Sequence, residues 1–299
     1  MGYRSVVISS AVHISVKNRQ LIISGEATGS IPVEDIRTLM IESRAATITA
    51  YALSELSENG VCVYLCDEKH LPSAVLQPFC RYSRQRKQLM LQLEQSKPAT
   101  KRMWRDVVVS KITNQAKCLE LCGVKEEQVK KVSALALQVQ SGDPTNVEAQ
   151  AAALYFRALF GSSFSRSEEN EINGALNYGY AIVRGYIARV LANYGFEPCL
   201  GIHHHSELNN FNLADDLIEP FRPLVDLFVF QNMPEGNLSP SDKRELCNIL
   251  NYEMISGKEH HATAYAIERL IHSLERCMGE KEETLLLPYI EELKRHEYE

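Results

Sequence analysis

The chain has 299 residues and a formal net charge of −6, with 45% hydrophobic and 23% charged residues. These values are ordinary for a globular protein, and the length suffices for two domains. No apolar run approaches the ~20 residues that span a bilayer, and the opening MGYRSVVISS lacks the long apolar core of a secretory signal. We therefore expect a cytoplasmic protein without a membrane segment, and eight cysteines that are buried small side chains rather than a disulfide scaffold.

Residues 1–75 are expected to be mostly β-structure. The runs RSVVIS, HISVKNRQLIIS and IRTLMIES are short and β-rich, and residues 17–19 sit at the centre of a predicted hairpin. A helix is predicted over 50–58 with Thr49 as its N-cap, followed by VCVYLC as a buried strand. Nothing in this region carries a chemical motif.

The remainder is predicted to be helical, with residues 76–82 as a linker and 83–299 as a larger α-helical domain. The fold class is therefore α+β, a small N-terminal β-domain followed by a larger all-α domain. Thr145 or Asn146 can cap one of the helices, and 161–175 is a polar loop by composition. The predicted helices cover 84–95, 99–121, 125–140, 148–160 and 178–194, and three acidic helices end the chain.

Charge is unevenly distributed along the chain. Residues 79–117 contain ten lysines and arginines but only two acids, whereas the segment from 235 to the end is acidic. A solvated helix face would explain such a stripe, but so few acids are available for pairing that we favour contact with phosphate groups. The cations proposed for DNA contact are Arg81, Arg84, Arg86 and Lys87.

The stretch 195–226 carries the most chemistry. It contains three consecutive histidines at 203–205, and Asp216 and Glu219 in D-L-x-E spacing, which places both carboxylates on one face of a helix. Imidazole and carboxylate groups are ligands of divalent metals that keep a position open for substrate. A solvated helix with surface histidines is the alternative, but the surrounding apolar residues favour a partly desolvated site.

Three segments resemble the CRISPR adaptation integrase family, the Cas-one protein. Gly201-x-x-His204 followed by NLADDLIEPFRP is similar to the active-site signature of that family, and 175–201 resembles the segment before it. The run NVEAQAAALYF from Asn146 resembles the family helix that carries a metal-binding glutamate. The resemblance covers nearly the whole chain, and the opening and compact length look like the type II branch.

This resemblance implies Glu148, His204 and Glu219 as catalytic metal ligands, with Asp216 as a further ligand or an acceptor behind them. Glu219 stands where other branches carry Asp. Two carboxylates and one neutral imidazole suit Mg²⁺ or Mn²⁺. The implied activity is the joining of 3′-hydroxyl ends of short DNA fragments into a CRISPR array by transesterification.

The resemblance also implies double-stranded DNA as substrate and a homodimeric protein. Two such homodimers are bridged by a dimer of the small Cas-two protein. In the type II branch, the effector nuclease and an accessory adaptation protein are further partners. Asn177, Tyr178 and Arg184 lie in the family-like segment and either pack the helix or contact DNA. The rival functions are a metal-dependent nuclease of branched DNA outside CRISPR and a non-enzymatic helical DNA-binding scaffold.

Overall fold

The computed structural model describes residues 2–68, 70–76, 84–232, 238–279 and 284–297. Its N-terminal part contains two four-stranded sheets, ordered β1-β5-β7-β8 and β4-β3-β2-β6. Their strands are β1 (Arg4–Ile8), β2 (His13–Lys17), β3 (Gln20–Ser24), β4 (Thr28–Pro32), β5 (Ile36–Ile41), β6 (Thr47–Ile48), β7 (Cys62–Cys66) and β8 (Pro72–Val75), with the 3₁₀ turn η1 (Val33–Asp35) and helix α1 (Ala50–Glu58) between them.

Local signals in this part produce the predicted elements. Asn18 and Arg19 connect β2 to β3 with φ of 51° and 58°, the left-handed values that a two-residue hairpin turn requires. The side chain of Thr49 accepts the backbone N–H of Ala52 and caps α1. The hairpin and the helix are confirmed.

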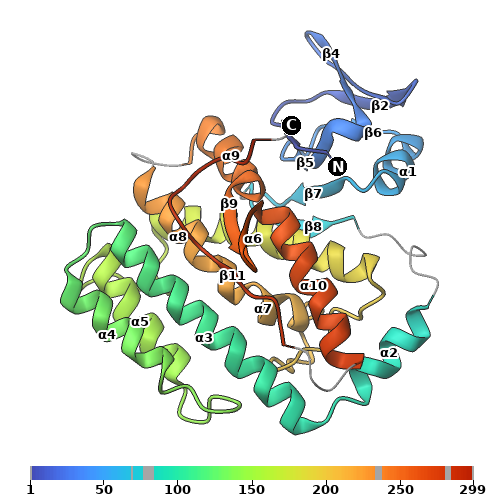
Figure 1. Ribbon diagram of the computed structural model, residues 1–299. Coiled ribbons are helices and arrows are strands. Elements are labelled where there is room, and N and C mark those ends of the chain that lie inside the picture. The colour runs from blue at the N-terminus through green and yellow to red at the C-terminus, as the bar shows by residue number, and fades with distance from the viewer. Residues whose placement is uncertain (1, 69, 77–83, 233–237, 280–283, 298–299) are drawn as a thin grey trace.

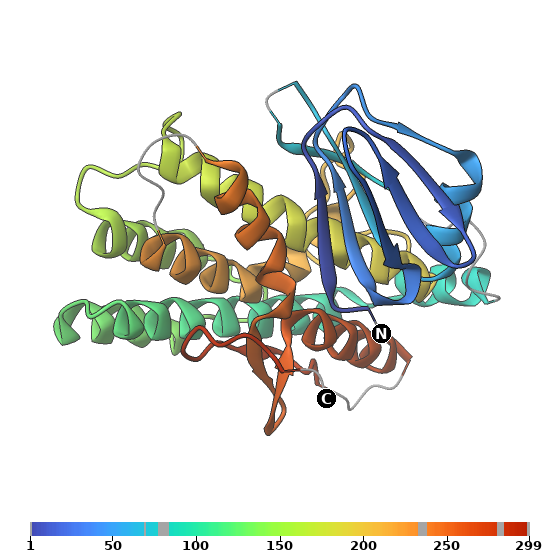
Figure 2. The same ribbon diagram turned by 90° about the horizontal axis from the view of Figure 1, so that it is seen from above.

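The two sheets face each other and the helices form a third layer (Figures 1 and 2). Side chains alternate across a strand, so β5 and β7 contribute to two cores. Leu39 and Val63 pack between the sheets, while Met40, Cys62 and Tyr64 join the core of the helical part. The first sheet is therefore buried on both faces, which anchors it firmly to the helices.

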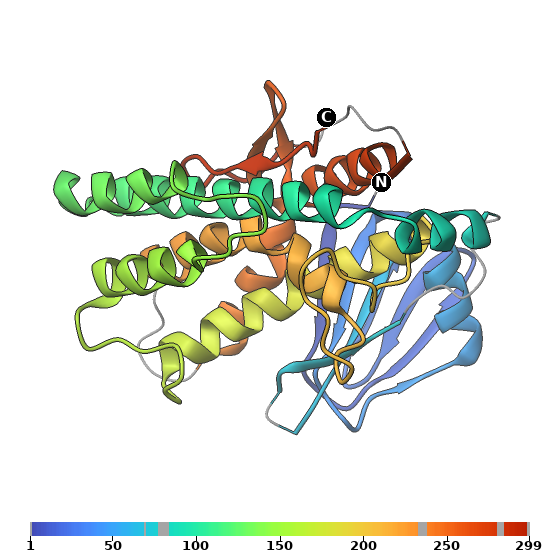
Figure 3. The ribbon, with the colours of Figure 1, turned by 90° about the horizontal axis from the view of Figure 1, so that it is seen from below.

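The helical part is built around the long helix α3 (Lys97–Leu121), which packs against α4, α5, α8 and the 3₁₀ turn η2 and crosses the whole part (Figure 3). No helix within the described ranges is both long and apolar enough to cross a membrane. The other helices are α2 (Gln85–Leu93), α4 (Glu126–Ala136), α5 (Val147–Phe160), α6 (Glu171–Asn193), α7 (Asn212–Leu217), α8 (Arg222–Gln231), α9 (Pro240–Cys247) and α10 (Thr263–Gly279), with η2 (Glu219–Phe221) and η3 (Asn248–Asn251).

The mixed fold with a largely helical C-terminal part is confirmed, but three details differ. The predicted run of three acidic helices is wrong, because β9 (Glu253–Ser256), β10 (Glu259–Ala262) and β11 (Pro288–Tyr289) form a small sheet. Gly257, with φ of 73°, makes the tight β9–β10 turn. Helix α6 begins at Glu171 inside the predicted loop, and α4 ends at Ala136 rather than at 140.

The predicted linker at 76–82 falls, apart from residue 76, outside the described residues. The division of the chain at this point stays a prediction. Before it, β8 ends at Val75 and pairs with β7, so the last strand of the first sheet ends where the β-domain was expected to end.

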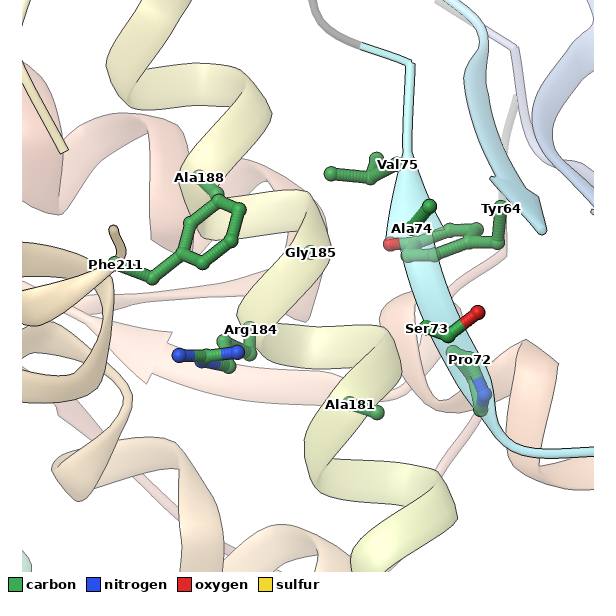
Figure 4. A pocket seen from close by; sticks show the side chains of 10 residues that line it. All are labelled: Tyr64, Pro72, Ser73, Ala74, Val75, Ala181, Arg184, Gly185, Ala188 and Phe211. Carbon is green, nitrogen blue, oxygen red and sulfur yellow. The ribbon is translucent and has the colours of Figure 1, made fainter. Parts of the chain in front are cut away.

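The first sheet meets the helical part where β7 and β8 lie against α6. A pocket of about 60 Å³ lies between β8 and α6 (Figure 4). The Tyr64 hydroxyl donates to the carbonyl of Ile182 at 2.6 Å, and a Cβ placed on Gly185 would lie 2.3 Å from the Tyr64 ring. The Tyr64 ring is buried and its hydroxyl is held by Ile182, which limits its movement away from α6. Gly185 is therefore required for the close approach.

We expect Gly185→Ala to lower the free energy of unfolding by about 1–3 kcal/mol through overpacking. Gly174→Ala is the matched control, because it lies in the same helix and its Cβ would meet no atom within 4 Å. That control should be neutral or stabilising by up to about 1 kcal/mol. Urea unfolding of both variants measures the difference, and equal stabilities would contradict the packing argument.

Candidate functional site

A buried carboxylate organises the histidine segment. Asp216 lies in α7 and is fully buried. Its Oδ2 accepts the backbone N–H groups of Ile202 at 2.5 Å and His203 at 2.9 Å, and its Oδ1 accepts that of His204 at 3.1 Å. The Nδ1 of the His204 ring lies 2.6 Å from the same Oδ1. Both oxygens are thus engaged, and Asp216 is an acceptor that positions His204; its role as a further metal ligand stays a prediction.

The Gly201-x-x-His204 spacing has a steric cause. A Cβ on residue 201 would lie 2.2 Å from the backbone oxygen of His204 and 2.8 Å from Oδ2 of Asp216. Contacts this short do not occur with a real Cβ, and the backbone oxygen cannot swing away. Only glycine at 201 lets the turn fold back onto Asp216.

Asp216 also determines the electrostatics of His204. The hydrogen bond that the imidazole donates to Asp216 is the largest influence on this ring and raises its pKa above 6.5, against the opposing effect of burial. The nearby charge of Glu219 acts in the same direction. Because Asp216 occupies Nδ1, the other ring nitrogen, Nε2, is the atom available for a metal or substrate.

Trp104, the single tryptophan of the chain, packs against two of the three histidines. Its ring stacks on His203 with centroids 4.1 Å apart and planes inclined by 2°, and it meets His204 edge-on at 5.7 Å. Burial lowers the pKa of His203. His203 therefore packs on Trp104 of α3, and His205 is exposed. The choice of His204 as the ligand of the triplet stays a prediction.

The two predicted glutamates converge on one lysine. Glu148 stands in the first turn of α5, where the side chain of Asp143 accepts its backbone N–H at 2.9 Å. Glu219 opens η2 and is 5% exposed. The ammonium of Lys111, from α3, lies 2.5 Å from Glu148 Oε1 and also contacts Glu219 Oε2. Three separate elements thus meet at this ammonium.

The surrounding charges keep these groups ionised. Burial would raise the pKa of Glu219, but the charges of Arg222 and Lys111 outweigh it and lower that pKa to about 2. Burial would lower the pKa of Lys111, but Glu219 and Glu148 raise it. Arg222 Nε donates to Glu219 Oε1 at 2.9 Å. The cluster is a balanced quartet of two anions and two cations.

Sequence reasoning missed Lys111 as a site residue, because it was counted with the cations of the basic stripe. Its signal was helical periodicity. Lys111 follows Trp104 by seven residues, two turns on the same face, and stands beside the buried Val107, Val108 and Ile112. A lysine on an apolar helix face needs a buried partner of opposite charge. Lys111 therefore differs from the exposed cations of residues 79–117.

The D-L-x-E prediction is partly wrong. Helix α7 ends at Leu217 and Glu219 begins a 3₁₀ turn with Pro220, so Asp216 and Glu219 serve different partners instead of sharing a helix face. Pro220 has no backbone N–H to continue the helix, which accounts for the tighter 3₁₀ turn at this point.

The ligand set Glu148, His204 and Glu219 stays a prediction. Within the residues that the structure describes, no three His, Cys, Asp or Glu side chains are gathered closely enough to hold a metal ion. The donor chemistry nevertheless fits a hard divalent cation. Glu219 Oε2 is buried and accepts no hydrogen bond from the described residues. It does form an ion pair with the Lys111 ammonium.

The predicted DNA contacts divide into two groups. Arg84, Arg86 and Lys87 are exposed at the start of α2 and remain predictions, while Arg81 lies outside the described residues. Asn177 is exposed and accepts a hydrogen bond from Arg166 at 2.7 Å, and its role in DNA binding also stays a prediction.

Two residues of the family-like segment take part in packing. Tyr178 is fully buried, with its hydroxyl 3.6 Å from the sulfur of Cys247, which agrees with the packing alternative, and its contact with DNA stays a prediction. The Arg184 guanidinium donates to both oxygens of Asp215, at 2.5 and 2.9 Å, and stacks on Phe211. It braces the loop before α7 through Nε and Nη2, and its contact with DNA stays a prediction.

The structure defines a mixed α/β protein in which α5 carries one glutamate, η2 carries the other, and the loop before α7 carries a histidine. The family model "CRISPR associated protein Cas1" matches residues 5–255. A protein named CRISPR-associated endonuclease Cas1 from Neisseria meningitidis serogroup C (strain 8013) is 43% identical over 306 residues, which cover 100% of both chains. This chain belongs to the Cas1 family.

Solved structures show the same fold at low sequence identity. A casposase bound to its integration product has a TM-score of 0.78 and 19% identity, covering 94% of this chain and 92% of that one. A chain of a Cas6-RT-Cas1–Cas2 complex has a TM-score of 0.71 and 19% identity, covering 97% of this chain and 36% of that one.

We expect Asp216→Asn to destabilise the metal-free protein by about 2–4 kcal/mol, because an amide group would face backbone donors. His204 has a raised pKa in the folded state, so its contribution is complete below its unfolded pKa near 6.5 and is lost as pH rises through the raised value. The destabilisation should therefore be larger at about pH 5.5 than at about pH 8.5.

Urea unfolding in EDTA and an NMR titration of His204 measure both effects. Asp215→Asn is the control, since Asp215 has the smaller influence on the His204 pKa. An unchanged His204 pKa in Asp216→Asn would contradict the assigned role of the carboxylate.

Proposed function

We propose that this protein joins 3′-hydroxyl ends of short DNA fragments into a CRISPR array by metal-dependent transesterification. Family membership supports the general activity. The observation that carries the specific site is the convergence of Glu148 and Glu219, from separate elements, on one buried cation. His204 is held by Asp216 in the same part of the fold.

Glu148, His204 and Glu219 would hold Mg²⁺ or Mn²⁺. When bound, such an ion polarises a phosphodiester and favours ionisation of a 3′-hydroxyl. The chain's own groups prepare the ligands. Asp216 occupies Nδ1 of His204 and turns Nε2 outward, while Arg222 and Lys111 keep Glu219 ionised.

The proposed substrate is double-stranded DNA, and the proposed assembly is a homodimer that works with a Cas2 dimer. The exposed cations of α2 support phosphate contact. The casposase neighbour is bound to an integration product and another neighbour is part of a Cas6-RT-Cas1–Cas2 complex, which supports this assignment. A cytoplasmic location follows from the substrate.

We expect the purified protein and its Cas2 partner to join 3′-hydroxyl duplexes into a supercoiled array plasmid with Mn²⁺. His204→Ala should lower the rate by orders of magnitude, whereas His203→Ala and His205→Ala lose severalfold. A metal-bound imidazole must be neutral, and Asp216 raises the His204 pKa above 6.5. Joining should therefore fall as pH decreases through that raised value, and excess Mn²⁺ should partly restore it.

Duplexes with 3′-deoxy ends provide the control for the nucleophile. If the plasmid is nicked in the presence of 3′-deoxy duplexes as fast as 3′-hydroxyl duplexes are joined to it, water is the nucleophile. The protein is then a nuclease rather than an integrase. Equal losses of joining rate in the three histidine variants would contradict the assignment of His204 as the metal ligand.

Replacing Arg84, Arg86 and Lys87 with glutamine should weaken binding to duplexes of any sequence. Each lost phosphate contact reduces the slope of log affinity against log salt concentration by about 0.9, so a reduction of about one to three is expected. Fluorescence anisotropy at several salt concentrations measures the slope. Lys130→Gln with Lys131→Gln is the control, because these exposed lysines of α4 pair with Glu126 and Glu127. Equal slopes for both sets would show that the cations of α2 face solvent and do not contact phosphate.

A further inference from the structure

The Lys111 ammonium lies where two carboxylates of the proposed metal site face each other. Its side chain is 8% exposed. It touches one oxygen of each glutamate, Oε1 of Glu148 and Oε2 of Glu219. The second oxygen of Glu219 belongs to Arg222. Oε2 is therefore the Glu219 atom that an incoming cation would take, and Lys111 already covers it.

A divalent cation and this ammonium cannot occupy the place together. Mg²⁺ binds oxygen at about 2.0–2.1 Å, and the ammonium lies 2.5 Å from Glu148 and in contact with Glu219. An ion that binds these two oxygens from the side on which the ammonium lies would overlap the nitrogen. Two positive ions in contact would also repel each other strongly in a buried place.

We propose that Lys111 is a resident counter-cation, which holds the glutamates together in the metal-free protein and leaves its place when the divalent ion binds. The inference rests on the proposed function, since it concerns the same site. Lys111 is then a positioning residue that sets how much metal the site requires. Its flexible four-carbon stem makes such a movement feasible.

The proposed role and a purely structural role predict opposite effects of removing Lys111 on metal affinity. If Lys111 only kept the glutamates in the geometry for metal binding, its removal would weaken the binding of metal. If it competes with the metal, its removal leaves two facing carboxylates without their counter-charge. The metal-free protein is then less stable, and Mn²⁺ binds more tightly because no ammonium must be displaced.

The first experiment measures Mn²⁺ binding by calorimetry in the full-length protein without DNA. Lys111→Met and Lys111→Gln should bind Mn²⁺ at least about tenfold more tightly than the wild type, in keeping with charge interactions of several kcal/mol at short range in a buried site. Thermal unfolding should show a lower midpoint without metal and a larger rise on adding Mn²⁺. Lys117→Gln is the control, because Lys117 is on the same helix and its ion pair among the described residues is with the exposed Glu120.

The second experiment uses the wild type and does not depend on the folding of any variant. Acetylation by a water-soluble anhydride is followed at each lysine by mass spectrometry, with and without Mn²⁺. Lys111 should be protected without metal and become reactive several times faster when Mn²⁺ is present. Lys117 should react at the same rate in both conditions.

The outcomes separate the two hypotheses. Weaker or unchanged Mn²⁺ affinity in both Lys111 variants, or a Lys111 that stays protected at saturating Mn²⁺, overturns the inference but leaves the proposed function standing. If neither the wild type nor the variants bind Mn²⁺, the metal site of the proposed function fails as well. Binding by the variants alone supports the inference in its strongest form.

Discussion

The structure of the site depends on one buried carboxylate. A carboxylate in the interior is costly unless its oxygens accept hydrogen bonds, and Asp216 accepts three consecutive backbone N–H groups and one imidazole nitrogen. Three neighbouring N–H groups can point at one carboxylate only if the backbone turns tightly, which is why residue 201 has no room for a Cβ. Glycine, histidine and aspartate are therefore parts of a single constraint. Two of these residues never need to touch a substrate in order to determine where His204 stands.

Helix α3 supplies the opposite wall of the site through two residues that are two turns apart. Trp104 covers the histidine segment with its ring, and Lys111 reaches the glutamates with its ammonium. An apolar helix face thus serves aromatic packing at one point and charge neutralisation at another. Because Arg222 pairs with Glu219 from α8, the quartet carries no net charge. A buried cluster of this kind is tolerated when every charge has a partner, whereas removing one partner would leave a costly buried charge.

Predictions from the sequence succeeded where the signal was local and failed where a distant contact decided the outcome. Thr49 caps its helix through a bond within four residues, and the 17–19 hairpin depends on its own turn. The β9–β10 hairpin was missed because its strands are four residues long and flanked by helical sequence. The sequence left packing and DNA contact open for Tyr178, because its contact with Cys247 joins residues far apart in the chain. The separate roles of Asp216 and Glu219 follow from where α7 ends, which spacing alone could not show.

The two halves of the site are held by different kinds of force, and this has a consequence for how it works. The histidine half is fixed by hydrogen bonds from the backbone, which no substrate or metal needs to break. The glutamate half is held by ion pairs to two side chains, and such pairs can be exchanged for another cation without unfolding any element. A buried pair is strongly favoured only while its partners remain, so exchange requires an ion of higher charge at the same place. The proposed divalent ion has that charge, and the glutamate half is therefore the part of the site that responds to it while the His204 half stays fixed.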